Sequence, residues 1–320
     1  MIEKFCGTML RDDRRFALGV WLPCDASWTS PLNAATIPHR ADGVRSMPPA
    51  IDPFRITDKL EPSALDVMID RLEVRGHHPY FAKPLSEYLD RMEIDRRSTV
   101  LDLGCGTGIA ARAIAARPGF EGTILGIDRS DYLVQAARRF ADDEKVGGRV
   151  RFERGDSHAL GLGSASIDAV VAHTLFSHLD DPAKVLTEMR RVLRSDGVIA
   201  IFDGDCASLT FELADAERSR RMDDAIIASL VTNPRILRQM PRLLKDAGFV
   251  VDAIMPTIIT EIGTADYWKS AIESFAKLAP KAGILSEAET TAWVGEVLDA
   301  SANGVFFGSS VYYAYIAHAV

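Results

Sequence analysis

The sequence has 320 residues, of which 47% are hydrophobic, so the chain can bury a sizeable core in one large domain or in one domain with a cap. Its net charge of −8 offers no general attraction for phosphate backbones, which argues against nucleic acid as a partner. The four cysteines are widely spaced without a C-x-x-C pair, so neither a metal site nor a disulfide framework is predicted, and a cytoplasmic location is expected. No apolar run is long enough to span a membrane.

Residues 1–55 differ from the rest of the chain because six prolines interrupt any periodicity. We predict an irregular N-terminal arm that wraps the body or a partner subunit, which makes a homodimer one expectation. A signal peptide is the less favoured alternative, because the apolar run at residues 16–22 is short. Residues 56–95 are predicted to be helical, since their apolar positions lie on one helix face. These positions are Leu65, Met68, Ile69 and Leu72.

Residues 99–108 read Thr-Val-Leu-Asp-Leu-Gly-Cys-Gly-Thr-Gly and predict a buried strand, a glycine turn and then a helix. In such a step of a nucleotide-binding sheet, the glycines let the backbone come close to a ligand. A nicotinamide-binding motif would read G-x-G-x-x-G, but Ile109 occupies the place of its third glycine. Asp102 precedes the glycines and suits a ligand with a nearby positive charge better than a pyrophosphate.

The motif closely resembles motif I of the class I S-adenosylmethionine (SAM)-dependent methyltransferases, and the chain looks like their ubiquinone/menaquinone-biosynthesis-like (methyltransferase type 11) small-molecule group. The resemblance implies a doubly wound, Rossmann-like α/β fold with a mostly parallel seven-stranded sheet, an antiparallel last strand and helical caps. It implies SAM as the cofactor, S-adenosylhomocysteine as the product and a small-molecule acceptor. The methyltransferase domain would span residues 96–320, with helical insertions at 206–236 and 262–303, and residues 56–95 would form a lid.

The strands expected after the motif each end in a candidate cofactor residue. Asp128 follows the strand at 123–127 and lies 20 residues beyond Gly108, the spacing of a ribose-binding acid; the alternative is a turn residue. Asp156 follows the strand at 149–153 and resembles the acid of the family's adenine-binding turn, although it could also only stabilise that turn. The other candidates implied by the resemblance are Arg75, Tyr80, Asp102, Gly104, Cys105, Gly106, Gly108, Arg129, Ser157 and His173.

The candidate catalytic residues are His173, Asp203 and Asp205, at the carboxyl ends of the strands expected at 167–172 and 197–202. A positioned base would help an acceptor that loses a proton, and His173 is the first choice because its ordinary pKa is near 6.5. Alignment of the acceptor alone is the alternative. His178 is interpreted as a structural residue.

The last third is predicted to contain a charged helix at 211–232, a sixth strand that continues through Met255, two helices within 264–302 and a closing strand at 306–317. Ser286 and Glu289 form a capping box at the start of the second of these helices. Two other functions stay open at this point. One is a SAM-binding regulatory or partner protein without catalysis, and the other, less favoured, is a nicotinamide-dependent oxidoreductase.

Overall fold

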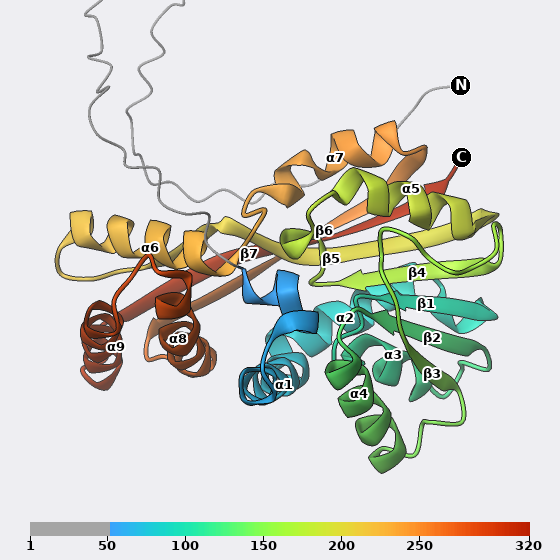
Figure 1. Ribbon diagram of the computed structural model, residues 1–320. Helices are drawn as coiled ribbons and strands as arrows, with labels where there is room; N and C mark the ends of the chain where they lie inside the picture. Colours follow the sequence, from blue (N-terminus) through green and yellow to red (C-terminus); the bar gives the residue numbers. More distant parts are fainter. Residues whose placement is uncertain (1–51) are drawn as a thin grey trace, which may run out of the picture. The chain divides into compact units, whose positions relative to one another are not determined.

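A seven-stranded sheet forms the centre of the computed structural model, which describes residues 52–320 (Figure 1). Its strand order is β3-β2-β1-β4-β5-β7-β6. The first five strands pair in parallel, whereas β7 lies between β5 and β6 and runs antiparallel to both. The strands are β1 (Thr99–Leu103), β2 (Thr123–Asp128), β3 (Val150–Arg154), β4 (Ile167–His173), β5 (Leu193–Phe211), β6 (Phe249–Gly263) and β7 (Phe306–Ala319). This topology confirms the predicted doubly wound, mostly parallel fold.

Helices cover both faces of this sheet (Figure 1). One face carries α1 (Pro62–His77), α2 (Pro79–Arg91), α3 (Ile109–Ala115) and α4 (Asp131–Asp143). The other face carries α5 (Pro182–Val192) and α7 (Ile236–Asp246). Short 3₁₀ helices connect several elements: η1 (Pro53–Lys59), η2 (Ile94–Arg96), η3 (Phe176–His178) and η4 (Ala279–Ala282).

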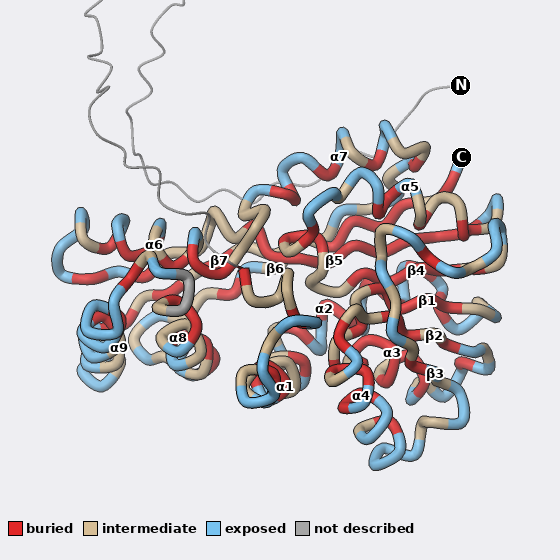
Figure 2. The backbone as a smooth tube through the Cα atoms, in the orientation of Figure 1, coloured by how far each residue is buried: buried red, intermediate tan, exposed pale blue. Residues whose placement is uncertain are grey.

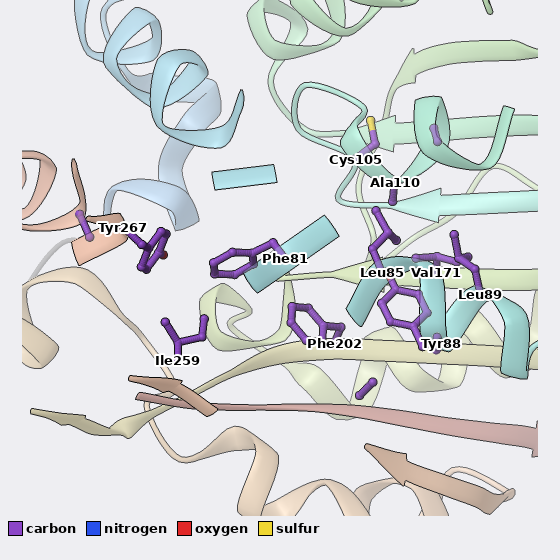
Figure 3. Packing of buried hydrophobic residues seen from close by; sticks show 14 of the residues in the cluster. Phe81, Leu85, Tyr88, Leu89, Cys105, Ala110, Val171, Phe202, Ile259 and Tyr267 are labelled. Carbon is purple, nitrogen blue, oxygen red and sulfur yellow. The ribbon is translucent and has the colours of Figure 1, made fainter. Parts of the chain in front are cut away.

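Each face of the sheet carries a large hydrophobic core, because successive side chains of a strand point to opposite faces. Phe202 of β5 packs on the α2 side, whereas its neighbour Ile201 packs on the α5 side. Figure 3 shows the first core, in which the Tyr88 and Phe202 rings lie 6.0 Å apart between their centroids. The central strands are buried along most of their length, whereas the outer turns of the helices are exposed (Figure 2).

The long ends of β5, β6 and β7 extend beyond the parallel strands and support a separate group of helices (Figure 1). These helices are α6 (Ala216–Leu230), α8 (Tyr267–Leu278) and α9 (Glu287–Ala302). Phe211, at the end of β5, packs edge-on against Trp268 and Trp293, with ring centroids 5.2 and 5.6 Å apart. The capping box of Ser286 and Glu289 is present at the start of α9, as predicted.

Several predicted boundaries differ from the structure. A helical insertion was expected to begin at residue 206. Residues 206–211 instead form the last part of β5, which ends at Phe211. The sixth strand passes Met255 and ends at Gly263, because its extension continues to pair with β7. Residues 1–51 of the predicted arm lie outside the described residues. Its last residues are ordered rather than irregular, since Asp52 caps η1 by accepting a hydrogen bond from the Phe54 N–H at 2.9 Å.

Candidate active site

The glycine loop after β1 borders a cleft at the carboxyl ends of the parallel strands. Gly104 and Gly106 have φ angles of 68° and 53°, a left-handed conformation that glycine adopts without a steric penalty. The loop is tied to β2 because the N–H groups of Gly104 and Cys105 both donate to the Ile127 carbonyl, at 2.8 and 3.0 Å. A Cβ added at Gly104 would lie 2.6 Å from Leu175 Cδ1 and would have to adopt the left-handed φ, so a side chain there is strained. The loop backbone therefore stays open to a ligand.

Asp102 links β1 to the first turn of α3. Its Oδ2 accepts a hydrogen bond from the Ala111 N–H at 3.0 Å, and the residue also borders the cleft. Burial raises the pKa of this carboxyl group to about 7. A positive charge nearby would favour its ionised form, so the environment suits the cationic ligand that the sequence motif implies.

Asp128 stands at the end of β2 and joins the glycine loop to the turn before α4. Its two carboxylate oxygens accept the N–H groups of Gly106 and Ser130, both at 2.9 Å. Burial raises the pKa of Asp128, against the lowering effect of these backbone hydrogen bonds. Each oxygen keeps a second lone pair. The carboxylate can thus stabilise the loop and still accept hydrogen bonds from a pair of ligand hydroxyls.

Polar atoms without partners also line the cleft. Within the described residues, buried Thr107 Oγ1 and His158 Nε2 have no hydrogen-bond partner. Asp156 Oδ1 accepts the His158 N–H and is also 2.9 Å from its Nδ1. An unpaired buried polar group costs about 1–3 kcal/mol, so the cleft fits a polar ligand such as a nucleoside. The sequence analysis did not single out Thr107 and His158, although both follow directly on predicted motif residues.

Ten of the twelve predicted cofactor residues border this cleft, and two do not. Gly108 instead begins α3, where an added Cβ would lie 2.6 Å from Phe152 Cζ. Tyr80 faces β6 and α8, because its hydroxyl donates to the Thr260 carbonyl at 3.4 Å and its ring lies edge-on to Tyr267. The expectation that both residues contact the cofactor therefore has no geometric support. The ten that border the cleft are Arg75, Asp102, Gly104, Cys105, Gly106, Asp128, Arg129, Asp156, Ser157 and His173.

A second cavity, with an empty volume of about 840 Å³, lies among α6, α8 and the long ends of β5 and β7. Most of its wall is apolar: Leu209, Ile226, Leu230, Trp268, Phe275 and Leu278. Arg71 and Asp203 are the charged side chains that border this cavity and not the cleft. The predicted helical insertions thus enclose a space that could receive a second, mainly apolar molecule.

Four residues border both spaces and mark the junction between them: Phe54, Arg75, Thr174 and His178. Thr174 has a φ of 60°, a left-handed conformation that costs a non-glycine residue about 1–3 kcal/mol. Its N–H donates to the Phe202 carbonyl at 2.6 Å, and its hydroxyl accepts from Arg75 Nη2 at 2.7 Å. The chain therefore holds a strained residue in place where the two spaces meet.

His173 borders the cleft but not the second cavity. Its ring stacks on Phe202, and its Nδ1 lies 2.9 Å from the Tyr88 hydroxyl. Among the described residues the Tyr88 hydroxyl has this one hydrogen-bond partner, and if the hydroxyl donates to Nδ1, the neutral ring carries its proton on Nε2. Burial, and then the positive charge of Arg75, lower the pKa of His173 to about 3. In this arrangement His173 is a hydrogen-bond donor and a weak base.

The two predicted catalytic aspartates make internal contacts. Asp203 borders the second cavity, and its carboxylate accepts the N–H and hydroxyl of Ser177 at 2.9 and 3.0 Å and the N–H of Gly204 at 2.8 Å. Asp205 borders neither space. It forms a two-pronged ion pair with Arg238, with N–O distances of 2.7 to 2.9 Å. Asp205 is thus placed to hold α7 against β5 rather than to meet a ligand.

His178 pairs with Asp52, and the sequence analysis assigned neither residue to the site. His178 Nδ1 lies 2.8 Å from Asp52 Oδ2, which also accepts the Thr232 N–H and hydroxyl at 3.0 and 2.8 Å. Burial lowers the pKa of His178, but the charge and hydrogen bond of Asp52 outweigh burial and raise it above its ordinary value. Burial likewise raises the pKa of Asp52, yet His178 and Thr232 hold it below its usual range. In the neutral ring, which forms above the raised pKa, this carboxylate favours the proton on Nδ1 and leaves Nε2 as the acceptor at the junction.

Within residues 52–320 no group of histidine, cysteine and acidic side chains is arranged to hold a metal ion. In the same part of the chain, none of the helices combines the length and the apolar composition that crossing a membrane requires.

The chain has relatives among known proteins. Residues 101–201 match the family model of the methyltransferase domain known as Methyltransf_11. An uncharacterised 37.1 kDa protein in transposon Tn4556 of Streptomyces fradiae is 34% identical over 73% of this chain and 66% of its own length. Methyltransferase GfsG of Streptomyces halstedii is 26% identical over 75% of this chain and 80% of its own length. The sterol 24-C-methyltransferase erg6 of Aspergillus fumigatus is 32% identical over 35% of this chain and 29% of its own length.

Solved structures show the same fold. The structure of BH2331 from Bacillus halodurans C-125, a proposed methyltransferase, superimposes with a TM-score of 0.52 at 16% identity, over 73% of this chain and 97% of that protein. The chain spans less than two thirds of the length of several curated relatives, from 66% for the Streptomyces fradiae protein down to 29% for the sterol methyltransferase. Residues 101–201 are therefore similar to a methyltransferase domain, and the chain shares its fold with a solved structure of a proposed methyltransferase.

Proposed function

We propose that this protein transfers a methyl group from SAM, bound in the cleft, to a small-molecule acceptor bound in the second cavity. The observation that supports this most is that a cleft built on the glycine loop and Asp128 meets a separate apolar cavity at one junction. When bound, SAM supplies a methyl group on a sulfonium, and the electrons of the broken C–S bond return to sulfur. S-adenosylhomocysteine is then the product.

The residues of the cleft bind and orient the cofactor. Asp128 would accept hydrogen bonds from the ribose hydroxyls, and the free oxygen of Asp156 would accept one from the adenine amine. Asp102, whose pKa is raised to about 7 by burial, provides negative charge beside a cationic ligand. Holding the acceptor in line with the C–S bond can supply roughly 7–11 kcal/mol of barrier reduction.

His178 is the side chain best placed to take a proton from an acceptor that carries an O–H or N–H group. Its Nε2 is the unprotonated nitrogen when Asp52 holds the proton on Nδ1, and the ring borders both spaces. Nε2 of the neutral ring would take the proton that such an acceptor loses when it is methylated. This role replaces the first choice of the sequence analysis, His173, which in this arrangement donates through Nε2.

Calorimetry with SAM, S-adenosylhomocysteine and NADH tests the proposed cofactor. The variant Asp128→Asn removes a charged hydrogen-bond acceptor. It should therefore weaken SAM binding by about 2 kcal/mol, or roughly thirtyfold. The matched control is Asp131→Asn, three residues further on and exposed, which should bind SAM as the wild type does. Tight binding of NADH without a response to SAM would instead support the oxidoreductase. Binding of SAM without methyl transfer to any acceptor would support the regulatory alternative.

A further inference from the structure

Arg71 is a charged side chain in the wall of an otherwise mainly apolar cavity. It projects from α1, is only 8% exposed and borders the second cavity but not the cofactor cleft. Nη2 donates to the Tyr267 hydroxyl at 2.7 Å, and Nη1 donates to the Ser270 hydroxyl at 3.1 Å. Within residues 52–320, no carboxylate lies within ion-pair distance of its guanidinium. A guanidinium has five N–H donors, so these two contacts leave others for a ligand.

The contacts of Arg71 hold its guanidinium in one position. Its central carbon lies 5.1 Å from the centroid of the Tyr267 ring, and Tyr267 is itself buried at the start of α8. A positive charge kept this far from water is unfavourable unless an anion pairs with it. The arrangement thus resembles a prepared binding position for an anion, in which the guanidinium is already oriented before the anion arrives.

The other charged groups of the cavity do not fill this role. Asp203 borders the cavity, but its carboxylate already accepts three hydrogen bonds from Ser177 and Gly204. Arg75 lies one helical turn after Arg71, about 6 Å along the helix axis, and borders both spaces at the junction. Arg71 therefore marks a point in the cavity displaced from the junction, where methyl transfer would occur.

We infer that the second cavity binds an acceptor with an apolar body and one anionic group, a carboxylate or a phosphate, and that Arg71 holds this group away from the atom that receives the methyl group. The apolar side chains of α6 and α8 surround the body of the acceptor. This inference rests on the proposed function, because it takes the ligand of the second cavity to be the methyl acceptor. The binding of such a molecule can nevertheless be measured without methyl transfer.

The test compares ligands that share a ten-carbon chain and differ in the head group. Calorimetry of the full chain saturated with S-adenosylhomocysteine is carried out with decanoate, decyl phosphate, decan-1-ol and decyltrimethylammonium. At least one of the two anions should bind at least tenfold more tightly than the alcohol, and the cation should bind most weakly. The stronger of the two anions identifies the carboxylate or the phosphate as the preferred group. Equal binding of anion and alcohol, or no binding of any of the four, would overturn the inference.

Variants assign the preference to Arg71. Arg71→Gln should lose at least tenfold in affinity for the preferred anion while affinity for the alcohol stays within twofold. Arg221→Gln, which removes the same charge from an exposed position on α6, should change neither. Arg71→Lys keeps the charge and should keep a preference for the anion, so it decides the question if Arg71→Gln does not fold. An unchanged preference in Arg71→Gln would contradict the inference, whereas failure of the wild type to bind S-adenosylhomocysteine would contradict the proposed function.

Discussion

The two histidines near the junction show how the surroundings of a side chain set its proton affinity. His173 faces an uncharged hydroxyl and the nearby positive charge of Arg75, and burial lowers its pKa to about 3. His178 is also buried, but the carboxylate of Asp52 raises its pKa above the ordinary value. The same residue type therefore becomes a poor base at the end of β4 and a stronger base five residues later, at the end of η3.

Asp52→Asn should destabilise the protein in a way that depends on pH. The raised pKa of His178 contributes stability below its ordinary value of 6.5, and this contribution is lost as the pH rises through the raised value. The lowered pKa of Asp52 contributes stability above its ordinary value of 3.8, which is lost as the pH falls through the lowered value. Between these values both groups are charged, and removing one partner should cost about 3 kcal/mol.

Urea unfolding at pH 5.5 and at pH 9 measures this difference. The deficit of Asp52→Asn relative to the wild type should be larger at pH 5.5, because the stabilising charge of His178 is lost as the pH rises through its raised pKa. Glu93→Gln removes an exposed ion pair with Arg96 and should change the free energy of unfolding by less than about 1 kcal/mol at either pH. A deficit of the same size at both pH values would show that the pair is not ionic.

At the residue scale, local patterns predicted many of the polar residues that border the cleft and, of the four junction residues, only Arg75. Asp128 was found because its spacing from the glycine loop is set within a single strand–helix–strand unit. The contact between Asp52 and His178 joins residues 126 positions apart, and neither lies in a pattern with a fixed spacing. Asp205 was predicted to be catalytic because it follows an expected strand. The structure shows that its carboxylate instead forms an ion pair with Arg238.

At the scale of elements, α1 lies closely against the start of α3. A Cβ added at Gly76 would be 2.6 to 2.8 Å from three carbons of Ile109. Ile109 is the residue that replaces the third glycine of a nicotinamide-binding motif. In a nicotinamide-binding motif, the third glycine lets two backbones approach closely. Here Ile109 stands in its place, and the glycine that allows close packing is Gly76 of α1.

Gly76→Ala should destabilise the protein by about 1–3 kcal/mol through this overlap and weaken the binding of S-adenosylhomocysteine, because α1 borders the cleft. The double variant Gly76→Ala/Ile109→Ala should recover part of both losses, since it removes the side chain that the new methyl group meets. Gly295→Ala is the helical control, because no atom lies within 4 Å of its added Cβ. Additive losses in the double variant would show that the two positions are not coupled.

The lengths of the last strands were harder to predict from the sequence than the positions of the parallel strands. Ile258 and Ile262 of β6 are 66% and 75% exposed, so this stretch lacks the apolar burial that marks a core strand. It remains a strand because Ile258 pairs with Val311 and Ile262 with Phe307 of β7. Pairing of this kind depends on the fold as a whole. The parallel strands, in contrast, can be predicted from short, continuous apolar runs in the sequence.

At the scale of residues 52–320, the segment before α1 joins parts that are distant in sequence. Phe54, Arg55 and Thr57 border the cofactor cleft, and the Phe54 ring lies 4.9 Å from that of His178. Arg129, after β2, forms an ion pair with Asp58 at 3.2 Å. Asp52 adds the hydrogen bonds to Thr232 near the end of α6. One short segment thus contacts the cofactor cleft, the junction and the helices of the second cavity.

Two truncated chains test this joining role. A chain that begins at residue 51 keeps Asp52 and η1 and should bind S-adenosylhomocysteine within about threefold of the full chain, because it retains every described residue that borders the cleft. A chain that begins at residue 60 lacks Asp52, Phe54 and Arg55, so both its affinity and its free energy of unfolding should fall, the latter by about 3 kcal/mol for the broken buried pair alone. Calorimetry and urea unfolding of the two chains, at the same pH of 5.5, give the comparison. Equal affinity and stability in both would show that the segment covers the cleft without supporting it, and a loss already present in the longer chain would place part of the binding site before residue 51.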